Sequence, residues 1–573
     1  MENPEIRPED RKAIADIISE NFDMINCVRR LGSQANRTNL ARSLGASAVQ
    51  ITRSIQDLRN KNALATASAT DDSTIQVNPE FAYFLGIHIG SAYTRAVLSN
   101  FNLKALTEDD YEKHPFCNLK KDLKKDENHF KVEPLTETKS SSTNSSPQGV
   151  YFRSSSTGPR DFVQIAREID HILNTVLKSI AEALPFISVC IAIPGIFDRE
   201  RGVLEFCPNI KRLQGVNIAN LISTSTQEKM RKLSIPWFIE HDTECTLVHE
   251  RECLFLSATR SVTKENKIQE MQGFKNANKP NWAVLYYGSG IGSSFCLNNQ
   301  IIRGACNAVG ELGHIPSPFL TPKGLDSTDL NHIDLISLYE ELFNKNYALF
   351  EEYKKRLTEA DCASPGKNPD DHAIISIKKP DSEEVERVYA VYFYYDRNGV
   401  LKCHKLNKEV HNVPECECHK DYCMETAIRA LCFDSSTSEM FLKKHSVQKG
   451  LSIAKTLEEF AVLNPVQYKL LKRHVSFMVA ILVGVLNLDV LLVSGTTLCS
   501  IPGLQKEFRE MKYKNTLAQS ANSCEIEFGV NYESSSARGA AIAAFYKCLK
   551  GNRDLAALQP VKIFWKPLEL AER

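Results

Sequence analysis

The spacing of apolar residues changes along the chain and predicts two kinds of structure. In residues 1–65 apolar side chains recur at helical spacing around Gly45, as in Leu40, Ala41, Leu44, Ile51, Ile55 and Leu58. The next stretch, ATASATDDSTIQVNPE, is small and polar and has little to bury, so 66–80 is predicted to be a linker. From Phe81 the run FLGIHIGSAYTRAVLSN predicts a strand, a glycine turn and a second strand.

Strand and helix signals alternate through 81–573 and predict an α/β domain. A helix is expected near 163–184 and a strand at 187–193. Two blocks, 108–160 and 318–412, break the pattern and are predicted to be loop insertions. Within the second block we expect a helical stretch near 334–357 and a hairpin whose turn is Asn398-Gly399.

Length and composition narrow the class of protein. A chain of 573 residues predicts roughly two to four folding units, and a formal net charge of zero means that DNA binding would need a local basic patch. The N-terminus, MENPEIRPEDRK, lacks the apolar segment of a secretory signal, so we expect a cytoplasmic protein with reduced cysteines. The apolar run 477–493 contains Asn487 and Asp489 and predicts a buried helix and strand rather than a membrane span.

The segment SQANRTNLARSLGASAVQITRSIQDLRNKNAL has the layout of a helix-turn-helix, with Ser47 as the N-cap of its second helix. Ile51, Ile55 and Leu58 would face the core, and the candidate DNA-binding residues are Arg37, Ser47, Gln50, Thr52 and Arg53. Local positive charge for phosphate contacts would come from Arg29, Arg30, Arg37, Arg42, Arg59 and Lys61. The alternative is a helical module that binds protein or merely packs.

Three further motifs carry candidate chemistry, each with a structural alternative. The turn YGSGIGSSF contains Gly288, Gly290 and Gly292, which would expose backbone N–H groups to a phosphate or simply close a tight hairpin. In GELGH, Glu311 and His314 would share one face and bind a polyol or a metal, or else form a solvated turn. Asp242 follows a predicted strand, where α/β proteins collect catalytic side chains, although such an aspartate often only caps a helix.

Three cysteines in the loop CECHKDYC indicate a metal site. Cys416, Cys418 and Cys423 would supply three thiolates, and a tetrahedral zinc site needs one more ligand. His314 is the candidate for that ligand, with His411 and His419 as competitors. The alternative is that these are plain buried cysteines.

Taken in order, the motifs resemble those of the ROK family (repressors, open reading frames and sugar kinases), and within it the xylose and N-acetylglucosamine repressors that carry an N-terminal helix-turn-helix. The resemblance rests on LGIHIGSAYTRAVL, CIAIPGIFDRERGVLEFCPNI, IEHDTEC, GSGIGSSF, NQIIRGACNAVGELGH, CECHKDYCME, VLLVSGTTL and SSARGAAIAAF. It implies an actin-like ATPase-type fold with two α/β lobes, preceded by an all-α (winged) helix-turn-helix domain at 1–65. It also implies a homodimer on a palindromic operator.

By position, the resemblance implies that Asp242 occupies the place of the catalytic base. Sugar hydroxyls would be bound by Glu311, His314 and Glu425, with Asn209 assisting and with His241 where the family has asparagine. Gly90 and the glycines of 287–295 would take the places of the phosphate loops. Structural zinc would be held by His314, Cys416, Cys418 and Cys423, which gives His314 two parts to play.

One departure from the family changes the predicted function. Kinases of the family have aspartate where this chain has His88, and an imidazole serves Mg²⁺ and phosphate poorly. ATP and Mg²⁺ are therefore not expected as cofactors. The sequence predicts a sugar-responsive transcriptional regulator, most simply a repressor, that is not an enzyme. The alternatives are an ATP-dependent sugar kinase that retains Asp242, and a divergent protein–protein module.

Overall fold

The computed structural model describes most of the chain in segments. These are 6–68, 71–113 without residue 92, parts of 116–154, 160–257 without residue 182, 279–317 without residue 289, 465–495, 504–529 and 534–549. Short strands between 373 and 406, and residues 416, 418 and 423–425, are also described. All statements below concern these residues.

The N-terminal module consists of four helices and a hairpin. They are α1 (Pro8–Glu20), α2 (Phe22–Leu31), α3 (Arg37–Leu44), α4 (Ala48–Asn60), β1 (Leu64–Ser68) and β2 (Asp71–Val77). Gly45 ends α3 in the left-handed region, with φ of +61°, and Ser47 caps α4 through a capping box with Gln50. The predicted cap at Ser47 and the buried set Ile51, Ile55 and Leu58 are confirmed.

The prediction that 66–80 is a linker is wrong, because β2 lies within it. Strands β1 and β2 pair antiparallel, and Ile75 and Val77 are buried. The backbone N–H of Ile75 also donates to the carbonyl of Ala35, which ties the hairpin to the helices. Only two apolar residues in a polar stretch carry this packing, too few to give a strand signal. The hairpin has the place of a wing beside the helix-turn-helix.

Two large sheets form the core of the rest of the described chain, and five strands of the first correspond in order to the five strands of the second read from β20. The first runs β10-β7-β3-β4-β6-β5 and contains β3 (Tyr83–Ile89), β4 (Thr94–Ser99), β5 (Phe130–Pro134), β6 (Val150–Ser154), β7 (Phe186–Ile193) and β10 (Trp237–His241). The second runs β13-β12-β11-β19-β20 and contains β11 (Trp282–Tyr287), β12 (Ile291–Leu297), β13 (Gln300–Ile302), β19 (Val490–Ser494) and β20 (Glu525–Phe528).

In each sheet three strands form an antiparallel ladder, a fourth pairs in parallel with the first of these, and a fifth pairs in parallel with the fourth; the first sheet adds β5 at its antiparallel edge. This duplicated topology is that of an actin-like fold with two α/β lobes, so the predicted fold class is confirmed. The predicted buried helix and strand are also present, as α16 (Pro465–Leu486) and β19. No helix among the described residues is long and apolar enough to cross a membrane.

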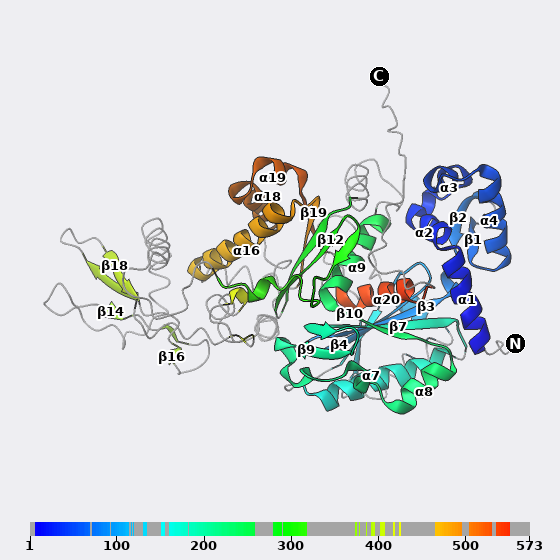
Figure 1. The fold of residues 1–573 in the computed structure, drawn as a ribbon, viewed down its shortest axis with the longest axis horizontal. Helices are drawn as coiled ribbons and strands as arrows, with labels where there is room; N and C mark the ends of the chain where they lie inside the picture. Colours follow the sequence, from blue (N-terminus) through cyan, green and yellow to red (C-terminus); the bar gives the residue numbers. More distant parts are fainter. Residues whose placement is uncertain are drawn as a thin grey trace, which may run out of the picture.

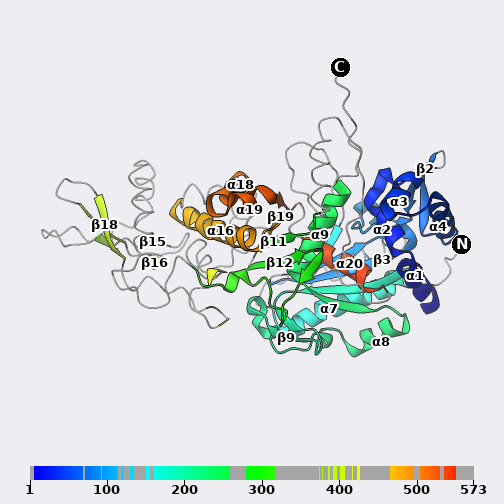
Figure 2. The same ribbon diagram turned by 45° about the horizontal axis from the view of Figure 1, so that its top comes forward.

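Two helices, α9 (Asp242–Ser257) and α20 (Ser535–Lys547), lie between the sheets (Figures 1 and 2). Glycines allow this close packing. A Cβ atom on Gly86 of β3 would lie 2.0 Å from the carbonyl oxygen of Ala537, and one on Gly539 would lie 1.8 Å from that of Cys245. Helix α20 therefore packs against both β3 and α9 at backbone contact distance. The outer face of the first sheet is covered by α7 (Phe162–Val176) and α8 (Thr224–Lys232).

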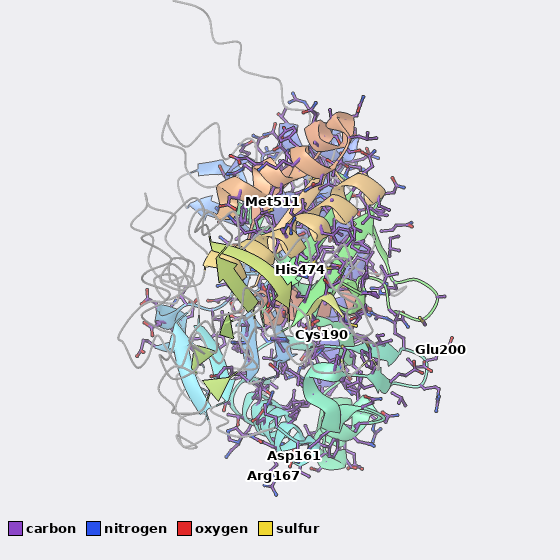
Figure 3. All side chains as sticks on the ribbon, turned by 90° about the vertical axis from the view of Figure 1, so that its left-hand side faces the viewer. Asp161, Arg167, Cys190, Glu200, His474 and Met511 are labelled. Carbon is purple, nitrogen blue, oxygen red and sulfur yellow. The ribbon has the colours of Figure 1, made fainter. Side chains whose placement is uncertain are left out.

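Side chains separate between interior and surface as this layering requires (Figure 3). Cys190 on β7 and His474 on α16 are fully buried, whereas Arg167 on α7 and Glu200 are exposed. The second lobe is completed by α18 (Leu504–Asn515) and α19 (Ala518–Ser523), which pack near α16 (Figure 1).

The interpretation of 108–160 as a loop insertion is wrong in part. Strand β6 within it is the third strand of the antiparallel ladder in the first sheet, and β5 pairs with it. Low-complexity sequence around these strands hid them. In the second block the predicted hairpin is confirmed by β17 (Val391–Tyr395) and β18 (Leu401–Leu406). The helical stretch expected near 334–357 lies outside the described residues.

Candidate functional site

A pocket opens where the two lobes meet, at the carboxyl ends of β3, β7 and β10. This edge of an α/β sheet is where ligands bind. Predicted site residues from both lobes line it: His88, Gly90, His241, Asp242, Gly290, Gly292, Glu311, His314 and Glu425. The structure thus brings together residues that are more than 300 positions apart in sequence.

Asp242 lies between two imidazoles at the start of α9. One carboxylate oxygen is 3.8 Å from Nε2 of His88 and the other is 3.3 Å from Nδ1 of His241. Burial raises the pKa of Asp242, but the contact with His88 and the charges of both imidazoles outweigh it and lower the pKa below its ordinary value. The N-terminus of α9 also favours the ionised form. Asp242 is therefore a carboxylate ready to accept hydrogen bonds.

Glu311 extends this chain of acidic and imidazole groups. It lies 3.9 Å from Nε2 of His241 and 3.7 Å from Nε2 of His314. Burial raises the pKa of Glu311, against the lowering effect of the two imidazoles. Glu425 also lines the pocket, and its Oε2 accepts a 2.7 Å hydrogen bond from the backbone N–H of Ile291. Three carboxylates and three imidazoles thus face one pocket, a set that suits the hydroxyl groups of a polyol.

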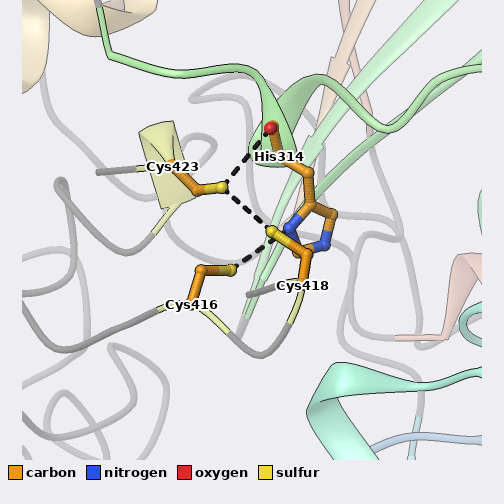
Figure 4. A group of neighbouring side chains, drawn as sticks. All are labelled: His314, Cys416, Cys418 and Cys423. Carbon is orange, nitrogen blue, oxygen red and sulfur yellow. Dashed lines mark hydrogen bonds between the residues drawn. The ribbon is translucent and has the colours of Figure 1, made fainter. Parts of the chain in front are cut away.

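The predicted cysteine cluster is assembled around His314 (Figure 4). Sγ of Cys416 is 3.3 Å from Nδ1 of His314, and the sulfurs of Cys418 and Cys423 are 3.2 Å apart. One donor atom from each of the four residues lies within 4.8 Å of the others. Zn–S bonds of about 2.3 Å and Zn–N bonds of about 2.0 Å require such spacing, so the donor set fits a tetrahedral zinc site.

Residue His314 uses its two ring nitrogens in different directions. Nδ1 faces the thiols and Nε2 faces Glu311. His314 ends the 3-10 turn Leu312–His314, and its ring packs edge-on against Phe206 with centroids 5.4 Å apart. Residues His411 and His419, the competing ligands, lie outside the described residues.

The turn between β3 and β4 is fixed by an arginine that the sequence did not reveal. Arg160 is buried and donates to the carbonyl of Gly90, to Oγ1 of Thr94 and to Glu168. It follows the low-complexity run SSSTGP, and nothing local to that run marks it as buried. His88, at the end of β3, is 6% exposed and points to Asp242.

The glycine turn of the second lobe is a tight hairpin, the structural alternative given for this motif. Tyr287 pairs with Ile291 across it, and the N–H of Gly288 donates to the carbonyl of Gly290. Gly292 lies against Thr243 of α9, where an added Cβ would be 3.0 Å from Cγ2. Thr243 was not predicted, yet its hydroxyl is 2.8 Å from Nδ1 of His241 and 2.6 Å from the hydroxyl of Ser294. It therefore joins the start of α9 to both walls of the cleft.

Of the remaining predicted residues, Asn209 lies in the turn Pro208–Leu213 beside the pocket, and its side chain is outside the description. Arg37 begins α3, Ser47 is the N-cap of α4, and Gln50, Thr52 and Arg53 lie on α4. Ser47, Gln50, Thr52 and Arg53 are exposed.

The prediction that Arg29 and Arg30 contact phosphate is wrong. Both are buried, at 3% and 1% exposure, and both bind Glu252 near the far end of α9. Their nitrogen atoms lie 2.7 Å and 2.6 Å from its carboxylate oxygens. The ion pairs with the buried Glu252 hold both arginine side chains in the interior. The basic residues left for DNA are those of α3, α4 and the turn after α4.

No family model matches the chain. A beta-glucoside kinase from Klebsiella pneumoniae is 27% identical over 146 residues, which make up 26% of this chain and 40% of that protein. The match therefore spans less than half of this curated relative.

Solved structures resemble the chain over more of its length. One is a ROK family transcriptional regulator, a homologue of the E. coli MLC protein, with 12% identity and a TM-score of 0.44, covering 94% of this chain and 99% of its own. Another is a ROK hexokinase from Thermus thermophilus, with 14% identity and a TM-score of 0.38, covering 81% of this chain and 98% of its own. Both are ROK family proteins. The motifs of this chain resemble those of the same family, whose solved members include both a regulator and kinases.

Proposed function

We propose that this protein is a ROK-type transcriptional regulator that binds operator DNA through α3 and α4 and responds to a sugar or sugar phosphate in the cleft. One observation carries the proposal. Helix α9 begins with Asp242 in the cleft and carries Glu252, the partner of α2, near its other end. A sugar that shifts the start of this helix would also shift its contact with the N-terminal module.

The contact at that end is extensive enough to transmit such a shift. The hydroxyl of Tyr546 on α20 lies 3.3 Å from the same Glu252 oxygen that Arg30 binds. Phe22 of α2 packs against Phe545 and Tyr546, with ring centroids 5.9 Å and 5.7 Å apart. Removing one partner from a buried ion pair costs several kcal/mol of stability. Arg29, Arg30, Glu252 and Tyr546 would therefore move together.

A sugar would be held in the cleft by hydrogen bonds to its hydroxyl groups. Asp242, Glu311 and Glu425 all line the pocket and would supply the acceptors. Hydrogen bonds to charged groups contribute about 1.5–3 kcal/mol each. A homodimer would present two copies of α4 to a palindromic operator.

Zinc would be held by His314, Cys416, Cys418 and Cys423 and would serve a structural role. Bound there, it would fix the ring of His314 so that Nε2 stays directed toward Glu311 and the sugar. We expect about one zinc ion per chain in the purified protein and none in Cys418→Ser, measured by elemental analysis. Cys306→Ser is the matched control, because Cys306 is an exposed cysteine outside the cluster. Equal zinc content in the two variants would contradict the assignment.

A sugar kinase is the second candidate, favoured by one observation. Asp242 is an ionised carboxylate in the cleft, as a catalytic base must be. Its contact with His88 argues for the regulator, because the imidazole occupies the position next to the carboxylate where the family's kinases have an acidic residue.

A thermal-shift screen separates these candidates. The full-length protein would be tested with sugars and sugar phosphates, each with and without ATP and Mg²⁺, and its affinity would be measured for duplexes selected from a random pool. A regulator gives a rise in Tm with one sugar, no further rise with ATP, and a change in DNA affinity of about 5- to 150-fold. Turnover of ATP that disappears in Asp242→Asn would establish the kinase instead. An unchanged DNA affinity with every stabilising sugar would refute the regulator.

A further inference from the structure

Helix α4 presents an apolar side chain where a DNA-reading helix meets base edges. Val49, the second residue of the helix, is 61% exposed, the most exposed large apolar residue described in the N-terminal module. A single exposed valine is common on protein surfaces and by itself indicates nothing. Its neighbours make it informative.

Polar residues at the start of α4 are engaged within the helix. The N–H of Ser47 donates to Oε1 of Gln50 at 2.9 Å, and the N–H of Gln50 donates to the hydroxyl of Ser47 at 3.3 Å. The hydroxyl of Thr52 donates to the carbonyl of Ala48 at 2.8 Å. If Gln50 or Ser47 turned to a base, the helix would lose its cap, which is worth about 1 kcal/mol. Three of the residues expected to contact DNA therefore already form hydrogen bonds within the helix or at its cap.

Arg53 is the charged residue on the same face as Val49. The two are four positions apart, so their side chains are neighbours about one helical turn from each other. Arginine donates two parallel hydrogen bonds to O6 and N7 of guanine, and an apolar side chain recognises thymine by its 5-methyl group. The spacing of Val49 and Arg53 suits two adjacent base pairs.

We propose that Val49 and Arg53 determine the sequence specificity of α4, with Val49 contacting the methyl group of a thymine and Arg53 the major-groove edge of a neighbouring guanine. This rests on the proposed function, because it applies only if α3 and α4 bind DNA. Ser47, Gln50 and Thr52 then shape and cap the helix rather than read bases.

Removal of single methyl groups from the DNA tests the role of Val49. Duplexes bound by the full-length protein would be selected from a random pool, and each thymine in the selected site would be replaced in turn by uracil. One replacement in each half-site should weaken wild-type binding about fourfold, the effect of leaving one methyl group unburied. In Val49→Ala the thymine and uracil duplexes should bind equally.

The control is Val163→Ala, which removes an equally typical surface valine, 51% exposed on α7 of the first lobe. It should keep the wild-type preference for thymine. Arg53→Ala should lose the preference for guanine at the adjacent base pair, by at least about fivefold. Tight DNA binding that ignores every uracil replacement overturns the assignment of Val49 while leaving the regulator intact. Absence of any selected duplex overturns the proposed function as well.

Discussion

The two ends of helix α9 carry the same arrangement of charges, but the two arrangements differ in burial and in the type of basic residue. At each, a carboxylate lies between two basic side chains. Asp242 lies 3.8 Å from His88 and 3.3 Å from His241, beside an open pocket. Glu252, ten residues further on, lies 2.7 Å and 2.6 Å from two arginines in the interior.

Distance, burial and the type of base separate the two arrangements. The side chain of Asp242 is 15% exposed, whereas those of Glu252 and its arginines are at most 2% exposed. Guanidinium groups stay charged at every working pH and lie within 2.7 Å of Glu252, whereas the imidazoles lie at least 3.3 Å from Asp242. Asp242 can thus give up its contacts with the imidazoles to bind a ligand, whereas Glu252 stays paired with its two arginines.

Substitution at each end should affect stability very unequally. Glu252→Gln leaves two buried guanidinium groups without a carboxylate and should lower the free energy of unfolding by about 3–5 kcal/mol. Asp242→Asn, at the more open end, should lower it by about 1 kcal/mol or less. Urea unfolding of both variants measures the difference. Equal losses of unfolding free energy in the two variants would show that the two carboxylates contribute equally to stability.

The pH dependence of stability should report the buried ion pairs of Glu252. Burial raises the pKa of Glu252, but Arg29 and Arg30 outweigh it and lower the pKa from 4.5 to about 2. Because the folded-state pKa is depressed, the stability it contributes is complete above about pH 4.5 and is lost as the pH falls toward 2. The stability difference between wild type and Glu252→Gln should therefore shrink across this window. A difference that stays constant down to pH 2.5, in urea unfolding, would contradict this account.

Ligand binding should reverse the ranking of the two ends. Asp242→Asn removes a charged acceptor from the cleft and should weaken binding of the effector sugar by about 10- to 100-fold. Glu252→Gln, assayed under conditions where it is folded, should retain sugar affinity within about threefold. Isothermal titration with the sugar found in the thermal-shift screen measures both constants, and a larger loss in Glu252→Gln would remove the distinction.

Much of the candidate site could be predicted because its signals are local. The cap at Ser47, the glycine turn at 287–295 and Asp242 after a strand each depend on residues within a few positions of one another. Their grouping in one pocket was expected only from the order of several motifs and a family resemblance. The position of Thr243 between the two walls had no signal of its own.

The sequence by itself determined the α/β character of the main domain, the helix-turn-helix layout and the residues that can bind metal or polyol, because apolar periodicity, capping and residue chemistry are short-range properties. Only the tertiary structure decided which charges are buried. Arg29 and Arg30 look like surface charge on a helix, and their partner Glu252 is more than 220 residues away. The same holds for Arg160 and for the strand β6, since a buried ion pair or an added strand forms only when distant segments meet.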